Sequence, residues 1–394
     1  MGKPPVAALR FRALDSWRGI CALLVAAHHL EAHGLFYWQP LVRNAWLFVD
    51  FFFVLSGFVI AHAYGDRLTQ SPAVETFIVR RIGRLWPLHA AVLAALIAIE
   101  ASQFAFWQPL GGSHPPFSAG RSIVSIFSNL FLIQGLGLHT SLTWNGPAWS
   151  ISAEFFTYVI FAFVCMATPA RKPRLIVSAL SALAAVTSLA CFSRYGMRES
   201  FGWGLPRCVF GFFLGTLTHK VWHLGVAEKV GGTIAESLVI VLTITFIVFV
   251  PGHAVLEYFA SPLFCLAVLI FAGERGFISK VLAMRAPAAL GRWSYSIYMV
   301  HTLVVVVLFS GLRVGEIAFG AHWLVRSVDG EFFLDLKDSV ANCLAFVAYL
   351  GTTVALAAAT FRLIELPGQR FFRLFVKAPV LPENRAGPHG STNR

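Results

Sequence analysis

The sequence contains 394 residues, of which 57% are hydrophobic and only 13% are charged. Because soluble domains typically carry about 25% charged residues, this composition excludes a soluble globular fold. A net charge of +12 could indicate a nucleic-acid-binding protein, but the lysines and arginines lie in the gaps between apolar segments, as in the loops of membrane proteins. We therefore expect a protein that is embedded in a lipid bilayer and has no nucleic-acid partner.

Ten apolar segments are long enough to form transmembrane helices, each of which needs about 20 mostly apolar residues. They comprise residues 15–34, 45–64, 86–107, 148–168, 174–192, 204–222, 234–251, 256–272, 290–311 and 340–362. These segments predict an all-α fold, a polytopic transmembrane bundle of ten spanning helices. An eleventh apolar run, 121–138, is shorter and contains Ser125, Ser128, Asn129 and Gln134, so it is not counted as a span.

Basic residues form four clusters outside the apolar cores of these segments: Lys3–Arg12, Arg80–Arg84, Arg171–Arg174 and Arg362–Lys377. The positive-inside rule places all four clusters, and hence both termini, in the cytoplasm. Residues 108–120 and 139–147 then both lie on the outer, non-cytoplasmic side of the membrane, so the run 121–138 begins and ends on that side. We predict a re-entrant or lateral helix there.

This topology divides the chain into three parts. Residues 1–13 form a cytoplasmic N-terminal segment, residues 14–367 form the membrane domain, and residues 368–394 form a cytoplasmic tail. The end of the tail is rich in Pro, Gly and polar residues, which predicts disorder. We expect a multi-pass protein of the inner (plasma) membrane.

Ionisable side chains inside the predicted spans are costly, so they mark candidate functional positions. Arg18 and His29 are eleven residues apart in the first span, which places them on one helix face about 16 Å apart. His29, Asp50 and Glu154 all fall within roughly 7–9 Å of the outer boundary when each span rises by about 1.5 Å per residue. An imidazole and two carboxylates at one depth predict a general base with orienting groups, with helix packing as the alternative.

Further candidates follow from charge and from breaks in the apolar pattern. The cluster at the start of the span 86–107 contains Arg80, Arg81 and Arg84, which are able to bind phosphates or to anchor the helix at lipid headgroups. Pro87 is typical of a helix start. Ser56 and Gly57 interrupt an apolar run, which would admit a thin ligand or another helix at close range. His301 lies in the middle of the span 290–311 and is a further candidate.

Five stretches of the chain together resemble the membrane-bound acyltransferase family 3, which includes O-acetylases of bacterial surface sugars and antibiotics. The stretches are Leu14–Ile20 with His29, Val49–Phe58, Arg80–Pro87, Trp149–Phe155 and Leu290–His301. They occur in family order across 14–367, and the ten-span count also agrees with the family. Two positions depart from the usual first motif, where Ser16 replaces a glycine and Trp17 replaces a common leucine.

The resemblance implies an O-acyltransferase that uses acyl-CoA, usually acetyl-CoA, as donor and needs no metal. It implies a hydroxyl of a carbohydrate or related acceptor, as in the O-acetylation of polysaccharides. On this hypothesis the three arginines 80, 81 and 84 hold the CoA phosphates at the cytoplasmic face. The pantetheine arm then passes Ser56 and Gly57 and presents the thioester near His29.

In the same hypothesis His29 removes the proton of the acceptor hydroxyl or transiently carries the acyl group. Glu154 or Asp50 orients the imidazole. Arg18 steadies the donor or pairs with Asp15. Trp149, from the fourth motif, and His301 complete the candidate residues.

Two other interpretations of the sequence are possible. A proton-coupled or acyl-group transporter also uses intramembrane His, Asp and Glu, although the sequence shows no paired broken helices or inverted repeats. The second alternative is a different membrane acyltransferase fold that uses His and Asn. The Arg18–His29 spacing and the arginine cluster argue against this fold. The sequence does not indicate the acceptor, the acyl length or the oligomeric state.

Overall fold

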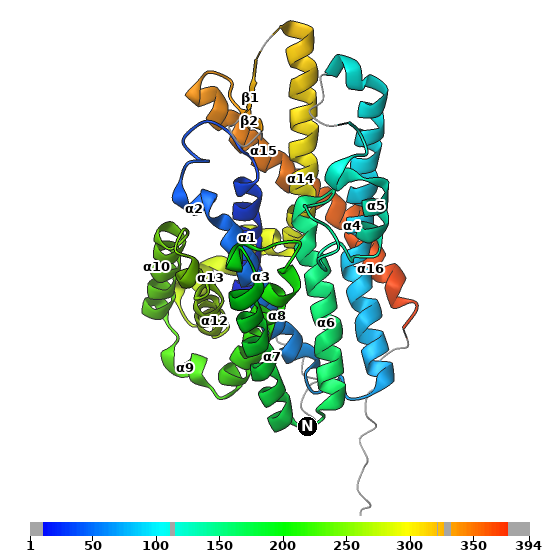
Figure 1. Cartoon of the computed structure of the whole chain (residues 1–394). Coiled ribbons are helices and arrows are strands. Elements are labelled where there is room, and N and C mark those ends of the chain that lie inside the picture. The colour runs from blue at the N-terminus through cyan, green and yellow to red at the C-terminus, as the bar shows by residue number, and fades with distance from the viewer. Residues whose placement is uncertain (1–10, 111–114, 321, 327–331, 377–394) are drawn as a thin grey trace, which may run out of the picture.

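The computed structural model describes residues 11–110, 115–320, 322–326 and 332–376. Figure 1 shows an elongated helical bundle. Ten helices overlap the ten predicted spans: α1 (Arg12–His28), α3 (Phe48–Tyr64), α4 (Ser71–Leu110), α6 (Trp149–Ala167), α7 (Arg171–Phe192), α8 (Gly204–His223), α10 (Thr233–Phe249), α12 (Ala260–Phe271), α14 (Arg285–Phe319) and α15 (Ser339–Thr360).

Shorter elements connect these helices. They are the α-helices α2 (Pro40–Arg43), α5 (Ile123–Leu130), α9 (Val226–Val230), α11 (Ala254–Glu257), α13 (Phe277–Leu282) and α16 (Leu366–Arg373), the 3-10 turns η1 (Ala45–Leu47), η2 (Ala119–Arg121), η3 (Gly146–Ala148) and η4 (Gly196–Arg198), and the π-helical turn η5 (Phe361–Glu365). Two strands, β1 (Leu324–Arg326) and β2 (Phe332–Leu334), pair antiparallel and are the departure from the predicted all-α fold.

Seven helical segments in the described part of the chain are long and apolar enough to cross a membrane. They are Ala45–Tyr64, Ser71–Phe104, Gly146–Ala167, Arg171–Phe192, Ala254–Phe271, Arg285–Phe319 and Ser339–Arg373. The multi-pass architecture is therefore confirmed, whereas the count of ten spans is not. Helices α1 and α10 have only 17 residues each, and α8 carries Arg207 and Lys220.

Contacts between helix ends define two opposite faces of the molecule. The ring of Phe11 lies 5.2 Å from the rings of Phe58 and His62 in the last turns of α3. Asp66, just after α3, pairs with Arg171 at the start of α7, and this hydrogen bond holds the pKa of the carboxyl group below its usual value. We call this the N-terminal face. At the opposite face, β2 bridges to Ala32 just beyond α1.

Helix α4 departs most from its predicted bounds. It begins at Ser71, with Pro72 in its first turn, and it continues through Pro87 for 40 residues. The prediction of a helix start at Pro87 was therefore wrong. A neighbouring helix covers this turn, because a Cβ on Gly83 would lie 2.4 Å from Phe372 of α16, and such packing stabilises a helix around an interior proline.

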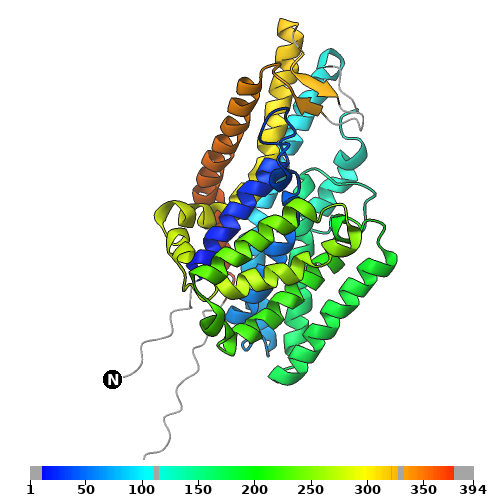
Figure 2. The same ribbon diagram turned by 90° about the vertical axis from the view of Figure 1, so that its left-hand side faces the viewer.

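The two longest helices, α4 and α14, extend beyond most of the bundle at the face opposite the N-terminal one (Figure 1). A hydrogen bond of 2.9 Å from Gln103 to Ser310 joins them in this region. Figure 2 shows α14 and α15 running side by side.

The apolar run 121–138 contains only the eight-residue helix α5. Its apolar side chains Ile123, Val124 and Phe127 are exposed, whereas Ser128 and Asn129 are buried against the rest of the protein. The polar residues that shorten this apolar run thus face inward. Most of the run after Leu130 is irregular, so the predicted re-entrant or lateral helix is much shorter than 121–138.

Glycines permit the closest helix contacts around the site. A Cβ on Gly57 of α3 would lie 1.8 Å from the carbonyl oxygen of Phe212 in α8, and a Cβ on Gly215 of α8 would lie 2.0 Å from that of Val54 in α3. Since no side chain fits at these crossings, the two helices pack backbone against backbone.

We expect Gly57→Ala to lower the free energy of unfolding by about 1–3 kcal/mol or more, because the added methyl group forces α3 away from α8. Thermal unfolding of the purified protein in detergent measures the loss. Gly351→Ala in α15 is the control, since a Cβ there meets nothing within 4 Å. An equal effect of both substitutions would contradict this account of the crossing.

Candidate active site

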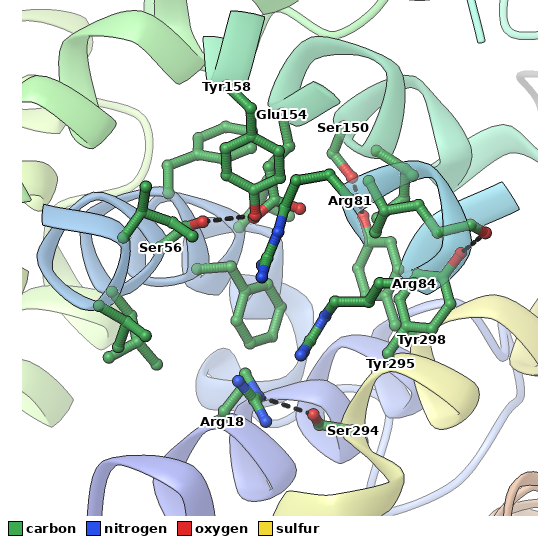
Figure 3. A pocket seen from close by; sticks show the side chains of 18 residues that line it. Arg18, Ser56, Arg81, Arg84, Ser150, Glu154, Tyr158, Ser294, Tyr295 and Tyr298 are labelled. Carbon is green, nitrogen blue, oxygen red and sulfur yellow. Dashed lines mark hydrogen bonds between the residues drawn. The ribbon is translucent and has the colours of Figure 1, made fainter. Parts of the chain in front are cut away.

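A cavity of about 110 Å³ lies between α1, α3, α4, α6 and α14 (Figure 3). Three guanidinium groups and one carboxylate line it, and we call it the arginine cavity. It follows α3 from Ile60 to Val49, which is roughly 16 Å along the helix. Its lining residues are Arg18, Val49, Phe52, Phe53, Leu55, Ser56, Val59, Ile60, Arg81, Arg84, Leu85, Ser150, Ile151, Glu154, Tyr158, Ser294, Tyr295 and Tyr298.

The arginines of this cavity differ in how their charge is satisfied. Arg18 donates from Nε to Ser294 at 2.8 Å and lies 3.4 Å from Asp15. Arg81 makes cation–π contacts of 5.5–5.7 Å with three aromatic rings, but its Nε is buried without a hydrogen-bond partner. Among the described residues, Arg84 forms no hydrogen bond, and no carboxylate lies within 4.0 Å of it. Figure 3 shows Arg81 and Arg84 pointing into the space that Arg18 also faces.

A short hydrogen-bond chain fixes the carboxylate of the arginine cavity. Tyr158 donates its hydroxyl proton to Glu154 at 2.6 Å, one helical turn earlier in α6. Ser56 of α3 lies 2.7 Å from the same hydroxyl and is therefore the donor in that contact. Ser56 and Glu154 thus face one cavity, as Figure 3 shows.

A second cavity, of about 250 Å³, lies nearer the face opposite the N-terminal one. We call it the histidine cavity. Its wall combines two histidines, two tryptophans and two arginines with a tyrosine and four smaller side chains. The lining residues are Val25, His28, His29, Trp46, Val49, Pro147, Trp149, Arg198, Ser200, Arg207 and Tyr298.

The end of helix α1 determines the hydrogen bonding of His29. The backbone N–H of His29 donates to Ala26, three residues earlier, instead of continuing the α-helical pattern. The carbonyl of Val25 therefore accepts from the side chain, and Nδ1 of His29 lies 2.8 Å from it. Since a carbonyl can only accept, the proton resides on Nδ1, and Nε2 keeps its lone pair.

His301 stands next to His29, with the ring centroids 4.8 Å apart. It is fully buried on α14, its Nδ1 lies 3.3 Å from the carbonyl of Ile297, and its Nε2 has no partner within the described residues. The structure thus brings together two candidates, one from the first predicted span and one from the span 290–311.

The expected grouping of His29 with both carboxylates is not found. Asp50 is fully buried and forms a two-pronged ion pair with Arg207 of α8, with N–O distances of 3.0 and 2.7 Å. Glu154 lines the arginine cavity instead. Neither carboxylate is hydrogen-bonded to His29, so the expectation that they orient the imidazole is wrong in geometry. The grouping rested on depth along each helix, which does not determine the direction of a side chain around its helix axis.

The remaining candidates separate into two groups. Arg18, Arg81 and Arg84 line the arginine cavity and Trp149 lines the histidine cavity. Arg80 and Gly57 line neither cavity, and Gly57 faces Phe212, which agrees with the packing alternative.

Arg207 was not among the predicted site residues, although it is an ionisable residue inside an apolar segment, which is the signal that identified Asp50. Arg207 lies beneath Trp46 and Trp149, at 5.4 and 5.6 Å from their ring centroids. Tyr298 was also missed, because nothing in a tyrosine within an apolar helix distinguishes it from core. Among the described residues, no group of three or more His, Cys, Asp or Glu side chains is arranged to hold a metal ion.

Comparisons with known proteins identify the family of the chain. A family model described as an acyltransferase domain, that of acyltransferase family 3, matches residues 11–362. Acyltransferase MdmB of Streptomyces mycarofaciens is 25% identical over 82% of this chain and 86% of its own length. Protein 2 in the picA locus of Rhizobium radiobacter is 31% identical over 46% of this chain and 96% of its own length.

The peptidoglycan O-acetyltransferase OatA of Listeria monocytogenes is 25% identical over 77% of this chain, which covers 51% of that longer protein. No solved structure matches the chain significantly. Because the family model covers nearly the whole membrane domain, the chain belongs to acyltransferase family 3 and is a multi-pass membrane acyltransferase.

Proposed function

We propose that the protein transfers an acyl group, most simply acetyl, from acyl-CoA to a hydroxyl of a carbohydrate or related acceptor. It acts in the inner (plasma) membrane with both termini, and hence the N-terminal face, in the cytoplasm. The observation that carries the proposal is the pairing of two adjoining cavities, one lined by Arg81, whose Nε is buried without a hydrogen-bond partner among the described residues, and one lined by His29, whose protonated Nδ1 leaves Nε2 with its lone pair.

The donor phosphates bind beside Arg81 and Arg84. Among the described residues, Asp15 pairs with Arg18 but neither Arg81 nor Arg84 forms an ion pair, and a charge removed from water needs a partner of opposite sign. Phosphate oxygens are well suited to guanidinium groups because they accept two hydrogen bonds at once. The narrow remainder of the cavity, past Ser56, takes the pantetheine arm toward the opposite face.

The acceptor occupies the histidine cavity. Trp46 and Trp149 line this cavity and give it apolar surface for a sugar ring, and Ser200 offers a hydroxyl group. The name of the peptidoglycan O-acetyltransferase relative supports a saccharide acceptor. The Asp50–Arg207 pair fixes one wall of this cavity.

His29 acts as the general base. Its Nε2 takes the proton of the acceptor hydroxyl while the acceptor oxygen forms a bond to the thioester carbonyl carbon. The carbon–sulfur bond then breaks, and the CoA thiolate leaves and takes the proton back from the imidazolium. The hydrogen bond from Nδ1 to Val25 keeps the imidazole in the tautomer that this step needs.

A direct assay tests the proposal. The purified protein in lipid nanodiscs is incubated with labelled acetyl-CoA and a panel of saccharides. Release of CoA thiol and an acetyl mass increment on the acceptor are both expected. Acceptor acetylation from another acyl donor but not from acetyl-CoA would refute the donor, and uptake of label into sealed vesicles without CoA release would favour a transporter.

Arg84→Ala is expected to raise the KM for acetyl-CoA by about tenfold or more with little change in the acceptor KM. A hydrogen bond to a charged group contributes about 1.5–3 kcal/mol, and 1.4 kcal/mol corresponds to about a factor of ten. Arg80→Ala is the matched control, since Arg80 lies on the same helix but outside the cavity. A larger effect on the acceptor KM, or an equal effect of Arg80→Ala, would refute phosphate binding at this site.

A further inference from the structure

The two cavities meet at two residues. Val49 of α3 and Tyr298 of α14 are the residues that line both the arginine cavity and the histidine cavity. Each side chain is largely buried, with 6% of Val49 and 5% of Tyr298 exposed. These two side chains therefore stand between the place where the arginines lie and the cavity that His29 lines.

Hydrogen bonds hold Tyr298 in this position. Its hydroxyl oxygen lies 2.7 Å from that of Ser150 at the start of α6 (Figure 3). It also lies 3.1 Å from the carbonyl oxygen of Pro147 in the turn η3. Ser150 also donates to Pro147 at 2.9 Å. The ring of Tyr298 lies 5.8 Å from that of His301, which in turn packs on His29. The position of Tyr298 is therefore linked both to the entrance of α6 and to the histidine pair.

Val49 closes the other side. It lies at the second position of α3, one residue before Asp50, whose ion pair with Arg207 fixes this end of the helix. Backbone contacts between α3 and α8, at Gly57 and Gly215, further fix α3. The valine side chain thus has little freedom to withdraw, whereas the hydroxyl of Tyr298 is held by hydrogen bonds.

We propose that Val49 and Tyr298 form an aperture through which the acyl group reaches His29, and that they set the size of the acyl group transferred. This inference rests on the proposed function. In the described state the aperture separates the two cavities, and a turn of the Tyr298 ring away from Ser150 and Pro147 joins them. A rigid valine opposite a mobile tyrosine admits a short acyl chain more readily than a long one.

Val49→Ala tests the aperture. It removes both methyl groups of the valine, and a butyryl group is longer than an acetyl group by two methylenes. We expect the ratio of kcat/KM for butyryl-CoA to that for acetyl-CoA to rise about tenfold or more, since one methylene alters such ratios by about 10–200-fold. The control is Val54→Ala, a buried valine on the same helix that lines neither cavity, for which the ratio stays as in the wild type.

Tyr298→Phe gives an independent test, because it keeps the ring and removes the hydroxyl that binds Ser150 and Pro147. We expect acetyl-CoA hydrolysis without acceptor to increase severalfold, with the donor KM changed less than twofold. An unchanged acyl ratio in Val49→Ala together with unchanged hydrolysis in Tyr298→Phe would overturn the aperture while leaving the proposed function intact. A wild-type protein that transfers neither acyl group from CoA would instead overturn the proposed function, and the aperture with it.

Discussion

Replacing His29 by alanine or asparagine is expected to lower kcat for acyl transfer by about 10²–10⁴-fold, the usual contribution of a general base. The asparagine variant is the more informative, because it separates the role of Nε2 from that of the hydrogen bond to Val25. Its side-chain amide is able to keep the hydrogen bond to the carbonyl of Val25, but it offers no nitrogen lone pair where Nε2 stands. Initial rates of CoA release with saturating donor and acceptor measure the effect.

His33→Ala is the control for this experiment, because His33 is an exposed histidine that lines neither cavity. It is expected to retain wild-type turnover. The amount of folded protein in the membrane fraction must be the same for all three variants. Wild-type turnover by His29→Asn would show that His29 is not the general base and would leave His301 as the candidate.

The second large effect concerns stability. Asp50→Ala is expected to lower the free energy of unfolding by about 3–5 kcal/mol, because it leaves the Arg207 guanidinium buried without its counter-charge. Thermal unfolding in detergent micelles measures this loss. Asp66→Ala, which removes an exposed partner of Arg171, is expected to change stability only slightly.

A double variant separates stability from function at this pair. Replacing a buried ion pair by apolar residues of similar size is often neutral, so Asp50→Leu combined with Arg207→Met is expected to recover most of the lost stability. If Arg207 forms part of the acceptor site, this variant folds but shows a raised acceptor KM. A double variant less stable than Asp50→Ala would show that the cost arises from packing and not from the unpaired charge.

The positions of the helices were largely predictable from the sequence, but their bounds were not. Length and apolarity are local properties, so each predicted span corresponds to a helix in the structure. The continuation of α4 through Pro87 goes with the contact between Gly83 and α16, which is distant in the chain. The strands β1 and β2 have three residues each, and such short strands leave no periodic pattern to detect.

The candidate site was predictable in part for the same reason. Spacing along one helix placed Arg18 and His29 far apart on α1, and the structure places them in two different cavities. Depth along each span was the basis for grouping Asp50 and Glu154 with His29, but depth does not determine where a side chain points. Arg207 of α8 fixes the position of Asp50, whereas Tyr158, one turn away on the same helix, fixes that of Glu154. The pairing of Asp50 with a residue of another helix is a property of tertiary packing, which one sequence does not reveal.

The way in which α1 stops has a chemical consequence. A helix that ran one turn further would use the carbonyl of Val25 for its own backbone, and the imidazole at position 29 would lose its fixed proton. The end of helix α1 thus determines which nitrogen of His29 carries the proton, and no carboxylate is needed for this. Substitutions that lengthen or shorten that coil by a single residue would therefore alter acid–base chemistry while leaving every polar side chain in the sequence untouched.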